Sequence, residues 1–127
     1  MGNGDHGIGI QEVVEITGIS AFTIRYYDKC GFFPSLHRDK RGVRSFAESD
    51  IRQLRLVDAL RKSGLSIEGI RYFVRLSKDA ARDPDRLAIM QTQINSLEYQ
   101  IAESRESLEL LKREAAALQS TSSSQDA

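Results

Sequence analysis

Apolar residues stand at helical spacing from residue 10 onward, and polar residues fill the positions between them. The apolar positions are Ile10, Val13, Val14 and Ile16. Gly18 then supplies the left-handed backbone conformation that commonly ends a helix, and Ser20 is a good N-cap for a second helix over residues 20–29. Two helices joined by a short glycine-containing turn are the pattern of a helix-turn-helix, although ordinary helical corners share it.

The chemistry of the second helix favours a nucleic-acid surface. Ile24 and Tyr27 can face the first helix, which leaves an arginine, a hydroxyl and aromatic rings available outside. These groups match phosphate oxygens and base edges. Alternatively, the two adjacent tyrosines are half-buried packing residues, or one tyrosine takes each role. The candidate DNA contacts from this helix are Ser20, Phe22, Thr23, Arg25, Tyr26 and Tyr27.

A small β-hairpin is predicted after the second helix. Gly31 stops that helix and Pro34 fixes the direction of the exit. Two short segments, one ending near Arg38 and the other covering residues 43–46, flank a polar tip that contains Gly42. A basic hairpin beside a helix-turn-helix is a wing, placed to lie along a phosphate backbone; the alternative is a solvated turn. The candidate phosphate contacts are Arg38, Lys40, Arg41 and Arg44.

Two further amphipathic helices complete a small domain over residues 10–78. The first covers residues 47–62 and ends at Ser63-Gly64, and the second begins at Ser66. Residues 1–9 are rich in glycine, and we expect them to be flexible.

The strongest periodic signal is a seam of five heptads in the last third of the chain. After a linker over residues 79–83, Asp83-Pro84 makes a strong helix start. The a and d positions of the seam are Leu87, Met90, Ile94, Leu97, Ile101, Ser104, Leu108, Leu111, Ala115 and Leu118. A helix over residues 84–118 would be roughly 50 Å long and would expose an apolar stripe, so it needs a partner. Residues 119–127 are predicted to be disordered.

The partner of this helix is predicted to be a second copy of the chain. Folding back onto the N-terminal domain is disfavoured, because that domain is much shorter than the helix. Glu98 and Lys112 become neighbours if two such helices run antiparallel about an axis near Arg105, whereas parallel pairing offers no ion pair. The predicted architecture is therefore mostly α-helical, a winged helix-turn-helix followed by a long antiparallel coiled-coil dimerisation helix.

The distribution of charge indicates which half of the chain would bind an anionic polymer. The 127 residues carry no net charge, but residues 1–78 hold thirteen basic and nine acidic residues, and residues 79–127 hold five and nine. There is one cysteine, no carboxylate or thiol stands at metal-ligand spacing from either histidine (His6 and His37), and no nucleophile–base set or phosphate loop stands out. We expect a cytoplasmic protein that is not an enzyme and has no cofactor, metal or membrane partner.

Five motifs in order carry a family resemblance. They are TGIS (Thr17–Ser20), TIRYYD (Thr23–Asp28), GFFP (Gly31–Pro34), GVRSF (Gly42–Phe46) and RKSGLSIEGI (Arg61–Ile70). With them the chain resembles the MerR family of bacterial transcription regulators, closely over residues 8–78 and in kind over the terminal helix. The resemblance implies a homodimer that binds a palindromic promoter between the polymerase recognition elements and distorts the DNA. It also implies DNA contacts from Thr23, Arg25, Tyr26 and Arg44.

The departures from the family concern the signal. Metal-sensing members carry cysteines around the dimer helix, iron–sulfur members need four thiolates and drug-binding members add a ligand domain; this sequence has none of these. The motifs look most like the branch with aldehyde- and thiol-stress regulators, but the cysteine of that branch corresponds to Ala59 here. Cys30 is the remaining candidate thiol sensor. Lys29 would favour its thiolate and the helix C-terminus opposes it, so an inert small residue is the alternative.

The leading hypothesis is a dimeric, sequence-specific regulator that binds double-stranded promoter DNA and meets RNA polymerase only indirectly. An architectural, excisionase-like DNA-binding protein is the first alternative, but it does not need the heptads. A coiled-coil interaction adaptor is the second, but it leaves the basic wing unexplained. The inducing signal, the operator and the choice between activation and repression stay open.

Overall fold

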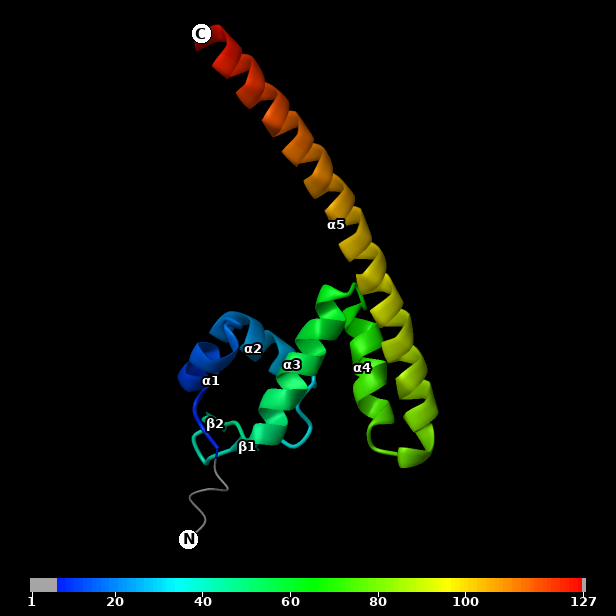
Figure 1. Cartoon of the computed structure of the whole chain (residues 1–127). Coiled ribbons are helices and arrows are strands. Elements are labelled where there is room, and N and C mark those ends of the chain that lie inside the picture. Colours follow the sequence, from blue (N-terminus) through cyan, green and yellow to red (C-terminus); the bar gives the residue numbers. More distant parts are fainter. Residues whose placement is uncertain (1–6, 127) are drawn as a thin grey trace.

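The helix-turn-helix corner, the wing and a long terminal helix all form in the computed structural model, which describes residues 7–126 and the side chains of residues 7–122 (Figure 1). The elements in chain order are α1 (Ile10–Thr17), α2 (Ala21–Lys29), β1 (His37–Arg38), β2 (Arg44–Ser45), α3 (Glu48–Lys62), α4 (Ile67–Leu76), a short 3-10 helix η2 (Ala80–Arg82) and α5 (Asp83–Asp126). The predicted fold class, a mostly helical winged domain followed by a long helix, is confirmed.

The corner between α1 and α2 is built by the residues that the sequence indicated. Gly18 ends α1 with φ of 73°, a left-handed conformation that costs a glycine little. The Ser20 side chain caps α2 by accepting a hydrogen bond from the Thr23 amide at 3.1 Å. These two local choices fix the turn, so α2 lies across α1 as a helix-turn-helix requires.

The wing is a two-stranded antiparallel hairpin in which His37 pairs with Ser45 and Arg38 with Arg44. Its tip is held by Asp39, whose carboxylate accepts hydrogen bonds from the amides of Arg41 and Val43 at 2.8 and 2.9 Å. Such bonds from an aspartate to the backbone that follows it stabilise tight turns. The tip therefore has a defined shape, although its side chains are exposed.

The segment before α1 is more ordered than the sequence suggested. Ile8 forms a β-bridge with Phe46 at the root of the wing, with N–H···O distances of 2.8 Å in both directions. Gly7 lies so close that a Cβ atom added there would be 1.9 Å from the Phe46 carbonyl oxygen. Residues 7–9 of the predicted flexible N-terminus are thus fixed by backbone pairing, which glycine content did not reveal. Residues 1–6 lie outside the described residues.

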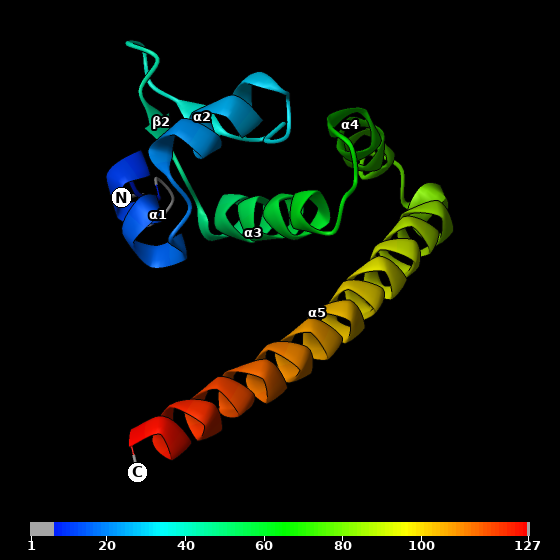
Figure 2. The ribbon, with the colours of Figure 1, turned by 90° about the horizontal axis from the view of Figure 1, so that it is seen from above.

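The buried core takes side chains from α1, α2, α3 and α4. Figures 1 and 2 show α3 between the α1–α2 pair and α4. Burial of large apolar side chains of this kind contributes about 1.5–3 kcal/mol each, which is how so small a domain holds together. The largest fully buried side chains are Phe32, Phe46, Phe73, Ile24, Leu54, Ile70, Val13 and Val57.

The terminal helix is longer than predicted. It begins at Asp83, directly after η2, and continues without a break to Asp126, beyond the predicted end at residue 118. The prediction of a disordered tail over residues 119–127 is therefore wrong as far as residue 126, and residue 127 lies outside the described residues. Once a helix exists, each added residue gains a hydrogen bond at little cost, and Thr121 bonds back to the Ala117 carbonyl at 3.0 Å.

The first part of α5 runs beside α4, and the rest projects away from the domain (Figure 1). The predicted linker, residues 79–83, is the tight bend between these two helices and contains η2. Over residues 7–126, no helix has the combined length and apolarity to cross a bilayer.

Candidate nucleic-acid interface and dimerisation surface

The two sides of α2 differ sharply in exposure. Ile24 is fully buried, whereas Phe22 is 80% exposed and Tyr26 is 44% exposed. Arg25 lies on the same exposed side. This face therefore presents a guanidinium and two aromatic rings to solvent, groups that pair with phosphates and base edges. Exposed aromatic residues are costly in water, which makes this surface unusual for a purely structural helix.

Ser20 and Thr23 stand at the start of α2, and their hydroxyls bond to each other at 3.0 Å. Ser20 is exposed and Thr23 is half-buried, so the pair lies at the surface of the domain, and its contact with DNA stays a prediction. Because Ser20 caps the helix, its role in shaping the corner is established independently of any contact with DNA.

Tyr27 takes the packing role that the sequence had left open between the two tyrosines. It is only 3% exposed, and its hydroxyl donates to the Asp58 carboxylate at 3.0 Å. Burial, with this hydrogen bond as the next cause, raises the pKa of Tyr27 to about 12. Its predicted contact with DNA does not fit this burial, because the helical period turns position 27 toward α3.

The wing is tied to α2 by Asp28. Arg38 donates two hydrogen bonds to this carboxylate, at 2.7 and 2.6 Å, and Arg44 adds a third at 2.6 Å. The bonds from Arg38 come first among the causes that hold the pKa of Asp28 below its usual value, although burial opposes them. The sequence analysis did not assign this role to Asp28. The signal that could have indicated it is an acidic residue that precedes the four basic residues of the wing.

The four basic residues of the wing consequently divide into two pairs. Arg44 is half-buried and Arg38 is 43% exposed, but both are bound to the buried carboxylate of Asp28, so their first role is to hold the wing in place. Lys40 and Arg41 lie at the exposed tip, where the side chain of Arg41 is 82% exposed and its guanidinium lies 3.3 Å from the Asp39 carboxylate. The tip pair is therefore the part of the wing most available to phosphate.

Cys30 is 8% exposed and belongs to the hydrophobic core at the end of α2. Its carbonyl accepts a hydrogen bond from Arg71 of α4 at 3.1 Å, so the backbone around it is held as well. A thiol must be reached by an electrophile or oxidant before it reacts. The burial favours the packing alternative for Cys30, and its role as a sensor stays a prediction.

Helix α5 uses different faces for its own domain and for the predicted seam. The half-buried positions against the domain include Arg86, Ile89, Gln93 and Ser96, which fall at heptad positions g and c. Met90 and Leu97, at d, are partly covered as well, whereas the a positions Leu87, Ile94 and Ile101 stay exposed. Folding back therefore occupies only the first heptads, and it leaves the a stripe uncovered.

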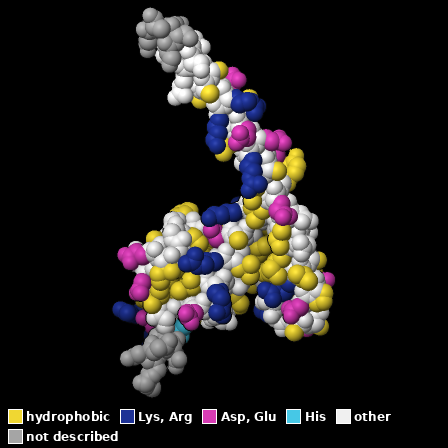
Figure 3. All heavy atoms as spheres, viewed as in Figure 1, with side chains coloured by type: hydrophobic (Ala, Val, Ile, Leu, Met, Phe, Trp, Pro, Cys, Tyr) yellow, Lys and Arg dark blue, Asp and Glu magenta, His cyan; other side chains and the backbone are white. Residues whose placement is uncertain are grey.

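Beyond the domain, every residue from 101 to 122 is exposed. Figure 3 shows this stretch as a single rod on which yellow apolar side chains alternate with charges of both signs. An apolar stripe on an isolated helix gains nothing from exposure to water. The seam positions on this stretch are Ile101, Ser104, Leu108, Leu111, Ala115 and Leu118, and their role as a dimer interface stays a prediction.

The order of these elements and their local motifs match a known family. The model of the MerR HTH family regulatory proteins matches residues 9–76, which include α1 to α4 and the wing. The chain belongs to the MerR family. This confirms the resemblance drawn from the motifs and the assignment to transcription regulators. An uncharacterised HTH-type transcriptional regulator from Haemophilus influenzae is similar, with 35% identity over 104 residues that cover 80% of this chain and 76% of that protein.

Solved MerR-family structures have the same architecture. HiNmlR, described as a MerR family regulator lacking the sensor domain and bound to promoter DNA, has a TM-score of 0.75 and 33% identity over 86% of this chain and 87% of that one. A MerR family regulator from Bacillus thuringiensis has a TM-score of 0.75 and 28% identity over 85% of this chain and 96% of that one. The MerR-family fold thus extends through most of α5 and is not confined to the matched domain.

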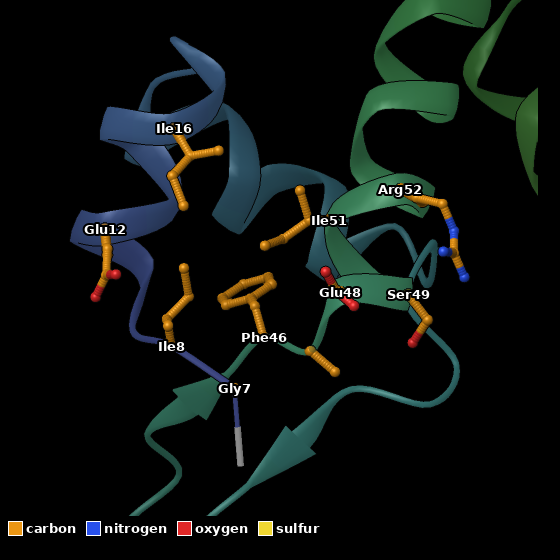
Figure 4. Close-up of a pocket in the computed structure, with 10 residues that line it drawn as sticks. Gly7, Ile8, Glu12, Ile16, Phe46, Glu48, Ser49, Ile51 and Arg52 are labelled. Carbon is orange, nitrogen blue, oxygen red and sulfur yellow. The ribbon is translucent and has the colours of Figure 1, made fainter. Parts of the chain in front are cut away.

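A hollow of about 820 Å³ lies between the segment before α1, α1 itself and the start of α3 (Figure 4). Its floor is apolar and is formed by Ile8, Phe46 and Ile51, which point into it. Two carboxylates, Glu12 and Glu48, and one guanidinium, Arg52, also line it. This excess of negative charge disfavours phosphate, so the hollow is a poor site for a nucleic-acid backbone.

Proposed function

We propose that this chain is a dimeric regulator that binds a palindromic promoter element, with α2 in the major groove and the wing tip on the adjacent phosphate backbone. The observation that carries the proposal is the exposed face of α2 formed by Phe22, Arg25 and Tyr26. It lies beside a wing whose position is fixed by Asp28. Arg25 suits a guanine edge or a phosphate, and Lys40 and Arg41 suit phosphates.

Two copies are needed for specificity. One recognition helix reads only a few base pairs, and dimeric helix-turn-helix proteins read two half-sites whose separation mirrors their symmetry. The exposed a and d stripe of α5 supplies a surface for a second copy, and antiparallel pairing places Glu98 opposite Lys112. A related structure supports this arrangement: HiNmlR, a MerR family regulator that lacks the sensor domain, is bound to promoter DNA.

We also propose the regulatory action that the family resemblance implies, which is distortion of the promoter. Binding between the polymerase recognition elements would distort the promoter, so RNA polymerase meets the effect through the DNA. Bending a site of 20–30 base pairs by 40–90° costs of order 1–6 kcal/mol, which the contacts of two protomers have to offset. A cytoplasmic location fits a protein whose ligand is chromosomal DNA.

The test begins with selection of binding sites from random double-stranded DNA by the purified full chain. The recovered sequences should contain an inverted repeat. Arg25→Ala and Tyr26→Phe should then lower affinity for that DNA, by an amount near the 1–3 kcal/mol typical of one specific contact, while the dimer stays intact by sedimentation. Glu15→Gln, an exposed acid on α1, is the matched control and should bind as the unmodified chain does.

Two results would redirect the assignment. A stable monomer in solution that still binds DNA would favour an architectural role. The absence of any salt-dependent affinity for DNA would favour a coiled-coil adaptor, because contacts with phosphates always produce such dependence.

A further inference from the structure

The corner between α3 and α4 ends in a serine that is almost completely enclosed. Ser63 is the C-cap of α3, is 2% exposed and donates its hydroxyl to the Leu60 carbonyl at 2.7 Å. The last carbonyls of a helix have no partner within the helix, so a buried helix end needs donors from elsewhere. At this corner the donors come from α5.

Three side chains of α5 converge on Ser63. The Gln93 amide nitrogen donates to the Ser63 hydroxyl at 2.8 Å and lies 3.4 Å from its carbonyl oxygen. The Ser96 hydroxyl and the Gln100 amide nitrogen donate to the same carbonyl oxygen at 3.0 and 3.3 Å. Gln100 also bonds to Ser96 at 3.3 Å, which links the donors to one another.

The spacing of these donors separates them from the seam. Positions 93, 96 and 100 follow one another at three and four residues, so they form one face of α5. They occupy heptad positions g and c, whereas the seam uses a and d. A substitution at Ser96 or Gln100 therefore alters the contact with the corner without removing an apolar residue from the seam.

The corner held in this way carries two exposed basic residues, Arg61 and Lys62, immediately before Ser63. At the other end of the contact, the Arg86 guanidinium lies over the Phe73 ring of α4, 4.6 Å from its centroid. Helix α5 is thus fixed to the domain at two places about two to four turns apart. Two attachment points define an angle, which a single point does not.

We propose that Gln93, Ser96 and Gln100 are positioning residues that set the angle between the DNA-binding domain and α5, and thereby the separation of half-sites that the dimer accepts. The proposal rests on the proposed function and deepens it. Apolar contacts such as those of Ile89 and Met90 tolerate small sliding movements, whereas hydrogen bonds weaken steeply when their angle changes. The polar contact at Ser63 is therefore the part of this joint that specifies one orientation.

The experiment uses the full chain and the inverted repeat that it selects from random DNA, resynthesised with one or two base pairs added to or removed from the centre. One base pair moves a half-site by roughly 3.4 Å and turns it by about 35°. We expect the unmodified chain to prefer one spacing strongly. Ser96→Ala and Gln100→Ala should each reduce the affinity ratio between that spacing and its neighbours by about fivefold, the effect of one hydrogen bond.

Three controls separate positioning from general damage. Ser96→Thr keeps the hydroxyl and should restore the preference for one spacing. Gln91→Ala changes an exposed glutamine of α5 that lies outside the face formed by positions 93, 96 and 100, and this variant should behave as the unmodified chain. Alanine favours a helix more than serine does, so Ser96→Ala should not weaken α5 itself. The slope of affinity against salt should stay the same in all variants, because no contact with phosphate is removed.

Two outcomes would overturn the proposal. Identical spacing profiles for the unmodified chain and for both alanine variants would show that the contact does not set the angle. An equal loss of affinity at every spacing would show that Ser96 and Gln100 support stability only. If the unmodified chain selects no DNA site at all, the proposed function itself fails and this inference fails with it.

Discussion

Asp28 of α2 and Arg38 of β1 form a two-pronged ion pair, with their nitrogen and oxygen atoms 2.7 and 2.6 Å apart. Arg44 of β2 joins the same carboxylate at 2.6 Å. Arg38 and Arg44 are directly opposite each other across the hairpin, where two like charges would repel. Asp28 neutralises that repulsion and, in doing so, attaches the wing to α2.

Replacing Asp28 with asparagine should destabilise the domain by roughly 2 kcal/mol. Removing one member of a buried ion pair costs about 3–5 kcal/mol, and the partial exposure of both arginines reduces this. Chemical denaturation measures the change, with Glu15→Gln as the control that removes an equal but exposed charge. Equal stability of Asp28→Asn and the unmodified chain would mean that the ion pair does not hold the wing.

Tyr27 should give the stability of the protein an alkaline limit. Burial raises its pKa from 10.0 to about 12 in the folded state, so its contribution is fully present below pH 10 and is lost as the pH rises through 12. Tyr27→Phe should lower stability at neutral pH by about 1 kcal/mol, because the hydrogen bond to Asp58 is lost, and should remove this alkaline component. Unfolding measured from pH 8 to 12 tests both effects. Tyr99→Phe, at an exposed position of α5, should leave the profile unchanged.

The two pairs of basic residues in the wing should respond differently to substitution. Lys40→Ala and Arg41→Ala should each reduce the slope of log affinity against log salt by about one unit, because each removes one contact with phosphate. Arg38→Ala should instead lower thermal stability, because it breaks the ion pair with Asp28. Binding of the selected DNA at several salt concentrations measures the slopes. Unchanged slopes for all four wing residues would remove the wing from the interface.

The seam predicts a clear effect on mass in solution. Ile101→Glu places a charge at an a position, and in a dimer this charge would be buried beside the partner helix. We expect this variant to sediment as a single chain and to lose affinity for a site with two half-sites. Tyr99→Glu introduces the same charge at an f position, away from the seam, and should leave the dimer intact. A dimer that survives Ile101→Glu would place the interface elsewhere.

The sequence was most informative where structure depends on local periodicity. The corner at Gly18 and Ser20, the wing and the long helix were predictable because their signals lie within a few residues or repeat every seven. The pairing of Asp28 with Arg38 and Arg44 was not, because it depends on the register of the hairpin and on how the wing lies against α2. The contact of Gln93 with Ser63 spans 30 residues and was likewise hidden.

Amino-acid composition gave a wrong prediction where the cooperativity of helix formation determined the structure. The run of serines after Gln119 has the make-up of a disordered segment, yet α5 continues through it because the preceding helix supplies the nucleus. Tyr27 shows the converse case. The pattern allowed both a packing and a binding role, and only the position of Asp58, thirty-one residues away, resolved it.

Because α5 is one unbroken helix, a rotation at its contact with Ser63 moves the whole part of the helix beyond that contact as a rigid rod. From Ser96, which bonds to Ser63, to its end at Asp126 the helix spans roughly 45 Å, so a tilt of about five degrees at this contact displaces the far end by about 4 Å. That displacement exceeds the rise of one base pair, roughly 3.4 Å. A small rotation at Ser63 is therefore amplified along α5 to the scale of one base-pair step, so a molecule that shifts this contact only slightly would move the far end of the helix by about a base-pair rise.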